Sequence, residues 1–366
     1  MWTREPNPHF TRKVPHAVGI FNPSALSSTT RQMDLSGALN LIGLLIGVGV
    51  VLVAGFLVVL GMVLRRGNPY PVVKRYPEEE SFTDPVNKKK SKFPSLEDKA
   101  ALTCSVIVPA YFEEERLPPM LEECLHFLEQ KSKTNSDFSY EVIIVSDGST
   151  DGTVNVALDY AKKFSVDKVR LLDLIKNRGK GGAVRLGVLS SRGKCILFAD
   201  ADGATKFADY DKLYKALIDL MKQDKYSGDV EQFQGIVCGS RAHMEEEAIA
   251  TRSIFRTILM RGFHLLVYIL TVRGIRDTQC GFKLFTRAAA RKCFSNLHIE
   301  RWAFDVELLC IAQALKIPIA EVGVNWTEIE GSKVTPILSW LQMGRDLFLI
   351  WFHYAIGAWK LIKKSD

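Results

Sequence analysis

The sequence predicts an α/β fold, in which a doubly wound and mostly parallel sheet carries helices on both faces. Short apolar runs rich in β-branched residues alternate with segments of helical periodicity between residues 103 and 200, as in consecutive β-α-β units. Polar motifs follow each apolar run, as expected where ligands bind at the carboxyl ends of parallel strands. A long uncharged segment near the N-terminus stands apart and predicts a membrane helix.

Composition excludes several classes of protein. The chain has 366 residues, 47% hydrophobic and 24% charged, which are ordinary globular values and exclude wholesale disorder. The net charge of +7 is mild and no dense Lys/Arg patch runs through the folded part, so nucleic acid is not expected as a partner. The 7 cysteines include no C-x-x-C pair, which argues against a disulfide framework or a zinc ribbon and favours a reducing compartment.

Residues 41–64 form an apolar run without a charged side chain. As a helix it would be about 36 Å long, which is enough to cross a bilayer core. A buried helix of a soluble protein normally has a polar face, and a cleaved signal peptide has a shorter apolar run that starts earlier. We therefore expect a single transmembrane anchor over residues 36–64, preceded by a disordered tail over residues 1–35.

Charges on the two sides of the anchor predict its orientation. Four basic residues follow it and one lies close before it. They are Arg65, Arg66, Lys74 and Arg75 after the anchor and Arg31 before it. By the positive-inside rule, the C-terminal bulk should be cytosolic. Residues 65–100, with several prolines and separate acidic and lysine runs, are expected to form a stalk or linker, which leaves residues 101–366 for the folded domain.

The elements of that domain alternate along the chain. Apolar runs predict four buried strands, and segments with one apolar helical face predict three helices between them. In chain order these are strand 104–109, helix 117–130, strand 141–145, helix 153–164, strand 169–172, helix 183–191 and strand 195–199. Two amphipathic C-terminal segments, 254–272 and 337–359, could be core helices, but their Trp and Tyr content near the C-terminus favours a membrane interface.

Polar motifs follow the first three strands. They are Pro109-Ala-Tyr111-Phe-Glu113, Asp147-Gly-Ser149 and Lys176-Asn-Arg-Gly-Lys180-Gly-Gly182. Taken alone, the first is as well explained as a turn and helix start, and the second as an Asp-Gly turn with a helix cap. The third combines three glycines and three cations before a helix N-terminus, so it is either an anion cradle or a flexible solvated loop.

The fourth motif is Asp200-Ala201-Asp202-Gly203, at the end of the last predicted strand. Two carboxylates so close together repel one another unless a cation lies between them. Carboxylate oxygens are the ligands that hard divalent ions prefer, so the motif predicts a Mg²⁺ or Mn²⁺ site that could hold a diphosphate. An acidic turn is the alternative, and the buried apolar run before the motif favours the site.

Together these motifs resemble those of the inverting family-2 glycosyltransferases, which have a GT-A fold. Motifs in the C-terminal half narrow the resemblance to the eukaryotic dolichyl-phosphate β-glucosyltransferases, over about residues 103–350. They are Gly239-Ser-Arg241-Ala-His243, Arg276-Asp277-Thr-Gln-Cys-Gly-Phe-Lys283, Glu300-Arg-Trp-Ala-Phe-Asp-Val-Glu307 and Asn325-Trp-Thr-Glu-Ile-Glu-Gly-Ser-Lys333, with Asp200-Ala-Asp-Gly-Ala-Thr-Lys-Phe207. One departure is Ser146-Asp147, where the family usually has two acidic residues. We expect Ser146 to be a turn residue.

The resemblance implies an activity and its partners. Glucose would pass from UDP-glucose to dolichyl phosphate with inversion, giving dolichyl β-D-glucosyl phosphate and UDP for protein N-glycosylation at the endoplasmic reticulum membrane. A sister enzyme that uses GDP-mannose is one alternative. A membrane tether that binds a nucleotide sugar without turnover is another, and the presence of both Asp200 and Asp202 argues against it.

The resemblance also implies roles for individual residues. Those expected around the base and ribose are Pro109, Tyr111, Glu113, Val145 and Asp147, and Lys180 joins them as a donor-binding residue. Those expected at the metal and diphosphate are Asp200, Ala201, Asp202, Arg241 and Lys333. Arg256 would hold the acceptor phosphate, with Arg252 or Arg261 as substitutes. Asp277 would orient the attacking group, and with Asp202 and Arg241 it makes up the expected catalytic set.

Overall fold

The computed structural model describes residues 35–66, 68–244, 262–263, 265–329, 331 and 338–363. The chain divides into two units, Met1–Met62 and Val63–Asp366. The tail expected over residues 1–35 lies outside the described residues except for Leu35.

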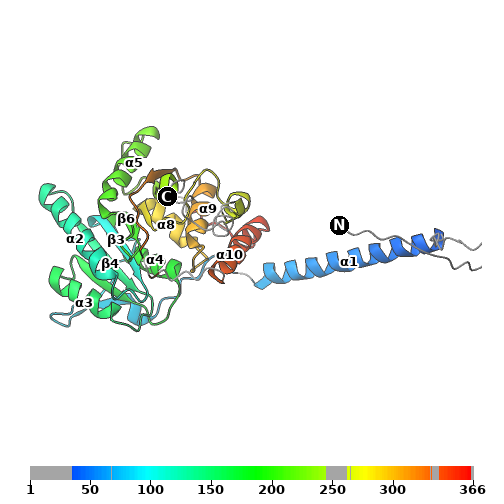
Figure 1. The fold of residues 1–366 in the computed structure, drawn as a ribbon, viewed down its shortest axis with the longest axis horizontal. Helices are drawn as coiled ribbons and strands as arrows, with labels where there is room; N and C mark the ends of the chain where they lie inside the picture. Colours follow the sequence, from blue (N-terminus) through cyan, green and yellow to red (C-terminus); the bar gives the residue numbers. More distant parts are fainter. Residues whose placement is uncertain are drawn as a thin grey trace, which may run out of the picture. The chain divides into compact units, whose positions relative to one another are not determined.

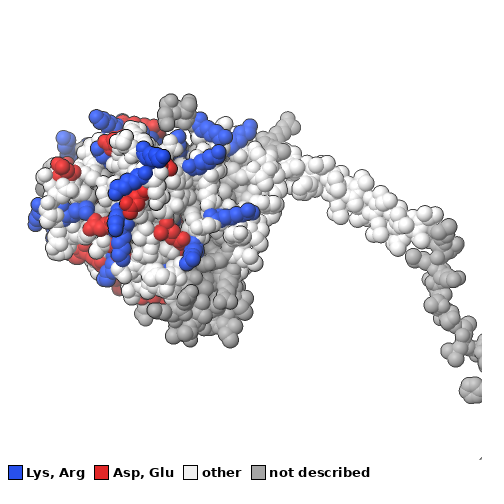
Figure 2. All heavy atoms as spheres, turned by 90° about the horizontal axis from the view of Figure 1, so that it is seen from above, with Lys and Arg blue, Asp and Glu red and all other residues white. Residues whose placement is uncertain are grey.

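Most of helix α1 (Leu35–Arg66) belongs to the N-terminal unit (Figure 1). The most apolar 18-residue window within its segment Ser36–Met62 has a mean hydropathy of 2.9, and none of that window is buried. In Figure 2 the part of this helix that is not drawn grey carries no Lys, Arg, Asp or Glu side chain. Among the described residues it is the one helix long and apolar enough to cross a membrane.

The second unit is built on a seven-stranded sheet with the strand order β5-β4-β3-β6-β8-β7-β9. The strands are β3 (Leu102–Ala110), β4 (Tyr140–Ser146), β5 (Val169–Asp173), β6 (Gly193–Ala199), β7 (Ile236–Ser240), β8 (Phe282–Thr286) and β9 (Ile319–Gly323). As predicted, β3 to β6 are parallel. β8 runs antiparallel to both of its neighbours, and β9 is parallel to β7. All of these strands except β8 therefore end at the same edge of the sheet.

Helices cover both faces of this sheet (Figure 1). The helices are α2 (Leu117–Thr134), α3 (Thr153–Phe164), α4 (Lys180–Leu189), α5 (Tyr210–Gln223), α8 (Arg287–Ser295), α9 (Phe304–Ala314) and α10 (Leu338–Ala355), with a short 3-10 helix η2 (Phe207–Asp209). One core cluster joins α2, α3 and α5 to one face, and another joins α4, α8, α9 and the buried side of α10 to the other. Because side chains alternate along a strand, Val106 and Ile107 of β3 lie in different clusters. The predicted doubly wound α/β class is confirmed.

Helix α4 begins at Lys180, three residues before its predicted start. Gly181 and Gly182 therefore lie in its first turn rather than in a loop. A Cβ added to Gly181 would lie 2.5 Å from the Cβ of Phe304. The small residue lets the start of α9 approach the start of α4, and this close contact is invisible in local sequence.

Residues 68–100, which we expected to belong to a stalk, pack against the rest of the second unit. They form a 3-10 helix η1 (Pro77–Glu80) and a two-stranded antiparallel sheet of β1 (Ser81–Thr83) and β2 (Lys90–Lys92). Phe93 and Leu96 belong to the core, and Glu79 is fully buried. An acidic run normally indicates a solvated segment because glutamate is seldom buried unless paired; here Arg178 pairs with Glu79 at 2.9 Å.

Candidate active site

Several polar side chains meet at the edge where the strands end. Asp200 follows β6, Arg241 follows β7 and Trp326 lies shortly after β9. β8 runs the other way, so the residues that precede it arrive at the same edge, and the Asp200 N–H donates to the Gly281 carbonyl at 3.0 Å. A Cβ on Gly281 would lie 2.0 Å from Asp200 Oδ2, so any side chain at position 281 would displace the Asp200 carboxylate.

Asp200 is paired with Lys180, the first residue of α4. The lysine ammonium lies 2.6 Å from Oδ1 and 2.8 Å from Oδ2 of the carboxylate. Burial alone would lower the pKa of Lys180, but the negative charges of Asp200 and Asp305 raise it. The divalent metal ion expected at this motif stays a prediction; the structure shows that a lysine also supplies positive charge at the first carboxylate.

Asp202 stabilises the turn that follows β6. Its Oδ1 accepts the N–H of Ala204 at 3.0 Å, Gly203 has a φ of 70°, and Ala201 between the two carboxylates is buried. Burial, and then the charge of Asp200, raise the pKa of Asp202. A divalent cation would offset both effects, so this pair of carboxylates fits a hard metal ion.

The residues expected to bind a divalent metal ion here are Asp200 and Asp202, so the protein would supply two carboxylates as ligands. In the described part of the chain, no group of three or more His, Cys, Asp or Glu side chains is placed to hold a metal ion. A divalent ion bound here would therefore complete its coordination with donor diphosphate oxygens and water, which is usual for Mg²⁺.

Arg241 and Asp277 form a two-pronged ion pair. Arg241 Nε donates to Oδ2 at 2.7 Å and Nη2 donates to Oδ1 at 2.9 Å, and the Arg241 guanidinium carbon lies 5.4 Å from the centroid of the Trp326 ring. Burial alone would raise the pKa of Asp277, but the hydrogen bonds and charge of Arg241 lower it. Asp277 therefore positions Arg241, and its expected contact with an attacking group stays a prediction.

A second ion pair, fully buried, joins β8 to α9. Lys283 Nζ donates to Asp305 Oδ1 at 2.7 Å and to the Cys280 carbonyl at 2.6 Å. Lys283 lies opposite Phe198 of β6, one residue from the end of that strand. The charge of Asp305 acts on Lys180, so this pair contributes to the electrostatic environment of Asp200.

Asp147 lies directly after β4 and binds the main chain just before α4. Its Oδ1 accepts the N–H of Arg178 at 2.7 Å, and its Oδ2 accepts the N–H of Gly179 at 2.8 Å. Burial raises the pKa of Asp147 to about 6, against the effect of these two hydrogen bonds. Both oxygens thus hold the loop that leads to Lys180, and a direct contact of Asp147 with the nucleotide stays a prediction.

Replacing Asp147 by alanine should weaken donor binding. The two N–H groups of the loop would lose their acceptor, at a cost of about 1–3 kcal/mol each when left unpaired. Ser146→Ala is the matched control and should be nearly neutral. Binding of UDP and the melting temperature should be measured on the wild type and both variants; the prediction fails if Asp147→Ala lowers only the melting temperature.

Ser146 itself differs from its expected role as a turn residue. It is fully buried and ends β4, in register with Asp173 of β5. An aspartate at this position, as is usual in the family resembled, would place a second carboxylate beside Asp173. We therefore expect Ser146→Asp to destabilise this chain.

The residues expected around the base lie at the ends of β3 and β4. Pro109 and Val145 are paired in the sheet, and the Val145 side chain is fully buried in the core. Tyr111 is 37% exposed. The Glu113 carboxylate accepts two hydrogen bonds from Arg116, at 2.7 and 2.5 Å. The buried Val145 side chain can thus support the site but cannot contact a ligand, whereas the Tyr111 side chain is accessible to one.

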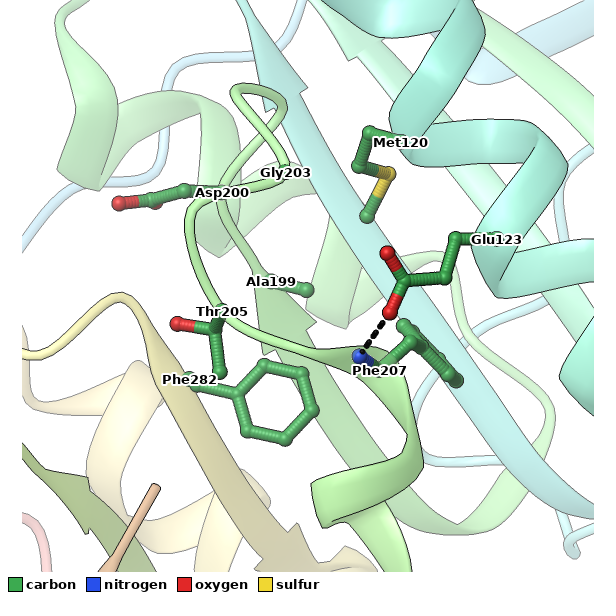
Figure 3. A pocket seen from close by; sticks show the side chains of 8 residues that line it. All are labelled: Met120, Glu123, Ala199, Asp200, Gly203, Thr205, Phe207 and Phe282. Carbon is green, nitrogen blue, oxygen red and sulfur yellow. Dashed lines mark hydrogen bonds between the residues drawn. The ribbon is translucent and has the colours of Figure 1, made fainter. Parts of the chain in front are cut away.

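A small cavity lies beside the Asp200 turn (Figure 3). It is lined by Met120, Glu123, Ala199, Asp200, Gly203, Thr205, Phe207 and Phe282, and its volume is about 10 Å³. The Glu123 carboxylate beside it accepts the N–H of Phe207 at 2.9 Å. A volume of this size holds about one water molecule, so the cavity is not a substrate pocket.

Comparison with known proteins decides the family. The family model described as Glycosyl transferase family 2 matches residues 105–294. A dolichyl-phosphate beta-glucosyltransferase of Drosophila melanogaster is 62% identical over 307 residues, covering 83% of this chain and 92% of the relative. The human protein of that name is 57% identical over 291 residues, covering 80% and 87%. The chain belongs to the dolichyl-phosphate β-glucosyltransferase family.

The resemblance inferred from the motifs is thereby confirmed, and the chain is a glycosyltransferase of family 2. A solved structure of glucosyl-3-phosphoglycerate synthase from Mycobacterium tuberculosis, in complex with Mn²⁺, uridine diphosphate and phosphoglyceric acid, is similar with a TM-score of 0.42 and 17% identity. The similarity covers 70% of this chain and 79% of that one.

Some residues implied by the family resemblance lie outside the described residues. They are Lys333 for the donor diphosphate, Arg256 for the acceptor phosphate, and its substitutes Arg252 and Arg261. The sequence analysis also gave no role to four residues whose contacts are described above. Lys283, Asp305 and Trp326 stand in motifs typical of the family but received no role, and Glu79 gave no signal because its acidic run indicated solvent.

Proposed function

We propose that this chain transfers glucose from UDP-glucose to dolichyl phosphate with inversion, giving dolichyl β-D-glucosyl phosphate and UDP. The observation that carries the proposal is its 57–62% identity to relatives named dolichyl-phosphate beta-glucosyltransferase. The arrangement of carboxylates and cations at the ends of β6 and β7 supports it, because the reaction must bring two phosphate-bearing substrates together.

In this reaction an oxygen of the acceptor phosphate attacks the anomeric carbon, from the face opposite the UDP leaving group. A new carbon–oxygen bond forms as the bond to the diphosphate breaks. The second pKa of a phosphate monoester is about 6, so the acceptor is largely dianionic at neutral pH and needs little help from a base. The protein's main tasks are to orient the two substrates and to stabilise the leaving diphosphate.

The residues at the sheet edge suit these tasks. The Arg241 guanidinium, held by Asp277, is one-third exposed and can bind a phosphate. Lys180 supplies a second positive charge, next to Asp200. Asp200 and Asp202 would hold a divalent cation, which would neutralise charge on the diphosphate as it leaves.

We propose that membrane lipids are partners as well. In α10, Met343 and Leu347 are buried while Leu341, Phe348 and Trp351 are exposed. Residues 265–270 are helical and expose four large apolar side chains. These are Leu265, Leu266, Tyr268 and Ile269. Apolar side chains exposed on these helices suit contact with the lipid interface that holds the acceptor, and α1 would be the transmembrane anchor.

The function is tested by sugar transfer in membranes that contain the chain. Radiolabelled UDP-glucose and GDP-mannose should each be offered with dolichyl phosphate, and the lipid product analysed. We expect glucose and not mannose in the product. Mannose transfer would favour the sister activity, and UDP binding without any transfer would favour the tether.

We further propose that α1 lies in the endoplasmic reticulum membrane and that the second unit is cytosolic. Asn325-Trp326-Thr327 is a glycosylation sequon, and Asn325 already donates its side-chain amide to Asp209 at 3.1 Å. We expect no glycan on Asn325 in cells, because the cytosol lacks the transfer reaction. A glycosidase-sensitive mass that disappears in Asn325→Gln would contradict this orientation.

A further inference from the structure

The segment that follows α1 in sequence holds the loop before α4 through one buried carboxylate. Glu79 Oε2 accepts from Arg178 Nη2 at 2.9 Å and from the Tyr76 N–H at 3.0 Å, and its Oε1 accepts the N–H of Ile175 at 3.1 Å. The Glu79 side chain is 0% exposed and that of Arg178 is 9% exposed. A buried carboxylate with these partners fixes the loop geometry strongly, because separating the pair would leave a charge unpaired.

The same segment also contacts the far end of α4. Arg75 donates to the Glu79 carbonyl through Nε and Nη2, at 3.1 and 2.7 Å, and Nη2 also donates to Ser190 Oγ at 2.8 Å. Ser190 is the residue that caps the C-terminus of α4. Arg178, at the other end, donates to the Lys74 carbonyl. Residues 74–79 therefore bind both ends of the helix that begins with Lys180.

The loop before α4 is thus held from two sides. On the side of the sheet edge, Asp147 accepts the N–H groups of Arg178 and Gly179. On the opposite side, Glu79 binds the Arg178 side chain and the Ile175 main chain. Lys180 follows at once and contacts Asp200, so a shift of this loop would move the ammonium away from the carboxylate.

We propose that Arg75 and Glu79 support the donor site, with Glu79 as a positioning residue that places Lys180 against Asp200 by way of Arg178. The inference rests on the proposed function, in which Lys180 and the divalent cation held by Asp200 and Asp202 would act on the donor diphosphate. Residues that the sequence analysis assigned to a stalk would then help to position the donor-binding residues. A chain shortened to begin after Glu80 would lose this support.

The test compares Glu79→Gln with Glu78→Gln in the full chain, reconstituted in lipid nanodiscs. Glutamine keeps the size of Glu79 and one acceptor oxygen but loses the charge, whereas Glu78 is exposed and serves as the matched control. We expect Glu79→Gln to raise the KM for UDP-glucose and the Kd for UDP about tenfold, since hydrogen bonds to a charged group are involved. The KM for dolichyl phosphate should not change, and Glu78→Gln should match the wild type.

A double variant separates positioning from general stability. If Glu79 acts through Arg178, Glu79→Gln combined with Arg178→Gln should raise the Kd for UDP no more than the worse single variant. The proposal is overturned if Glu79→Gln lowers the melting temperature without changing the Kd for UDP, or raises both substrate KM values equally.

Different results would contradict the proposed function and the positioning role of Glu79. A wild-type chain that binds UDP but transfers no glucose would end that function, and the Kd for UDP in Glu79→Gln would still decide the positioning role. A wild-type chain that binds no UDP would overturn both. Normal transfer with an unchanged Kd in Glu79→Gln would overturn the positioning role alone.

Discussion

Asp202→Asn is expected to abolish glucose transfer and leave the fold intact. Asparagine keeps the oxygen that accepts the Ala204 N–H but removes one of the two carboxylates available to a divalent ion. Stabilisation of charge by a metal contributes several kcal/mol to such a transition state, so we expect a loss of about a thousandfold or more in rate. Transfer activity and the melting temperature should be measured on the same preparations. The first tests the expected loss of glucose transfer, and the second tests whether the fold stays intact.

The melting temperature of Asp202→Asn should not be lower than that of the wild type, because the substitution removes a buried negative charge. Because burial and the charge of Asp200 raise the pKa of Asp202, its ionised form is less favourable in the folded than in the unfolded chain. Ionisation of Asp202 therefore reduces stability as the pH rises through its folded pKa. A neutral asparagine escapes this cost, so the variant should be as stable as the wild type or slightly more stable at neutral pH.

Chelation gives an independent check of the metal site. EDTA should inhibit the wild type reversibly, with Mg²⁺ or Mn²⁺ restoring transfer. A ligand that binds only the folded state raises its melting temperature, so Mn²⁺ with UDP should stabilise the wild type more than Asp202→Asn. Full transfer activity after exhaustive chelation would contradict the role assigned to the two carboxylates.

The sequence alone predicted the strands and helices between residues 104 and 199 well, because each of these elements can be recognised from its own residues. The strands at 104–109, 141–145, 169–172 and 195–199 are buried on both faces, and each therefore appears as a continuous apolar run. The motifs after them lie at a common edge because parallel strands end together. For this reason the order of residues along the chain is enough to expect Asp147 and Asp200, which follow two different strands, at one edge of the sheet.

The residues that sequence alone missed are joined by contacts between distant positions. Glu79 is buried because Arg178 lies beside it, 99 residues away in the chain. Lys283 interrupts an apolar strand and would normally be expected to face solvent, yet Asp305 of α9 pairs with it in the core. The antiparallel direction of β8 was also not predicted, because the strand motifs alone carry no information on pairing.

Lys283→Met is expected to be among the most destabilising single substitutions in this chain. Methionine has a similar shape, but it leaves the Asp305 carboxylate buried without its partner. Breaking one side of a buried ion pair costs about 3–5 kcal/mol, a large share of the roughly 5–15 kcal/mol by which domains are stable. Chemical unfolding of the chain in detergent should show a lower midpoint than the wild type.

Lys194→Met is the matched control for this substitution. Lys194 pairs with Asp229 at 2.6 Å, but the two side chains are 38% and 47% exposed, and exposed pairs contribute about 0–1 kcal/mol. If the loss in Lys283→Met comes from the unpaired carboxylate, adding Asp305→Leu should recover much of it, because an apolar pair can replace a buried ion pair at little cost. Equal midpoints for Lys283→Met and Lys194→Met would show that the buried pair does not stabilise the sheet as its geometry indicates.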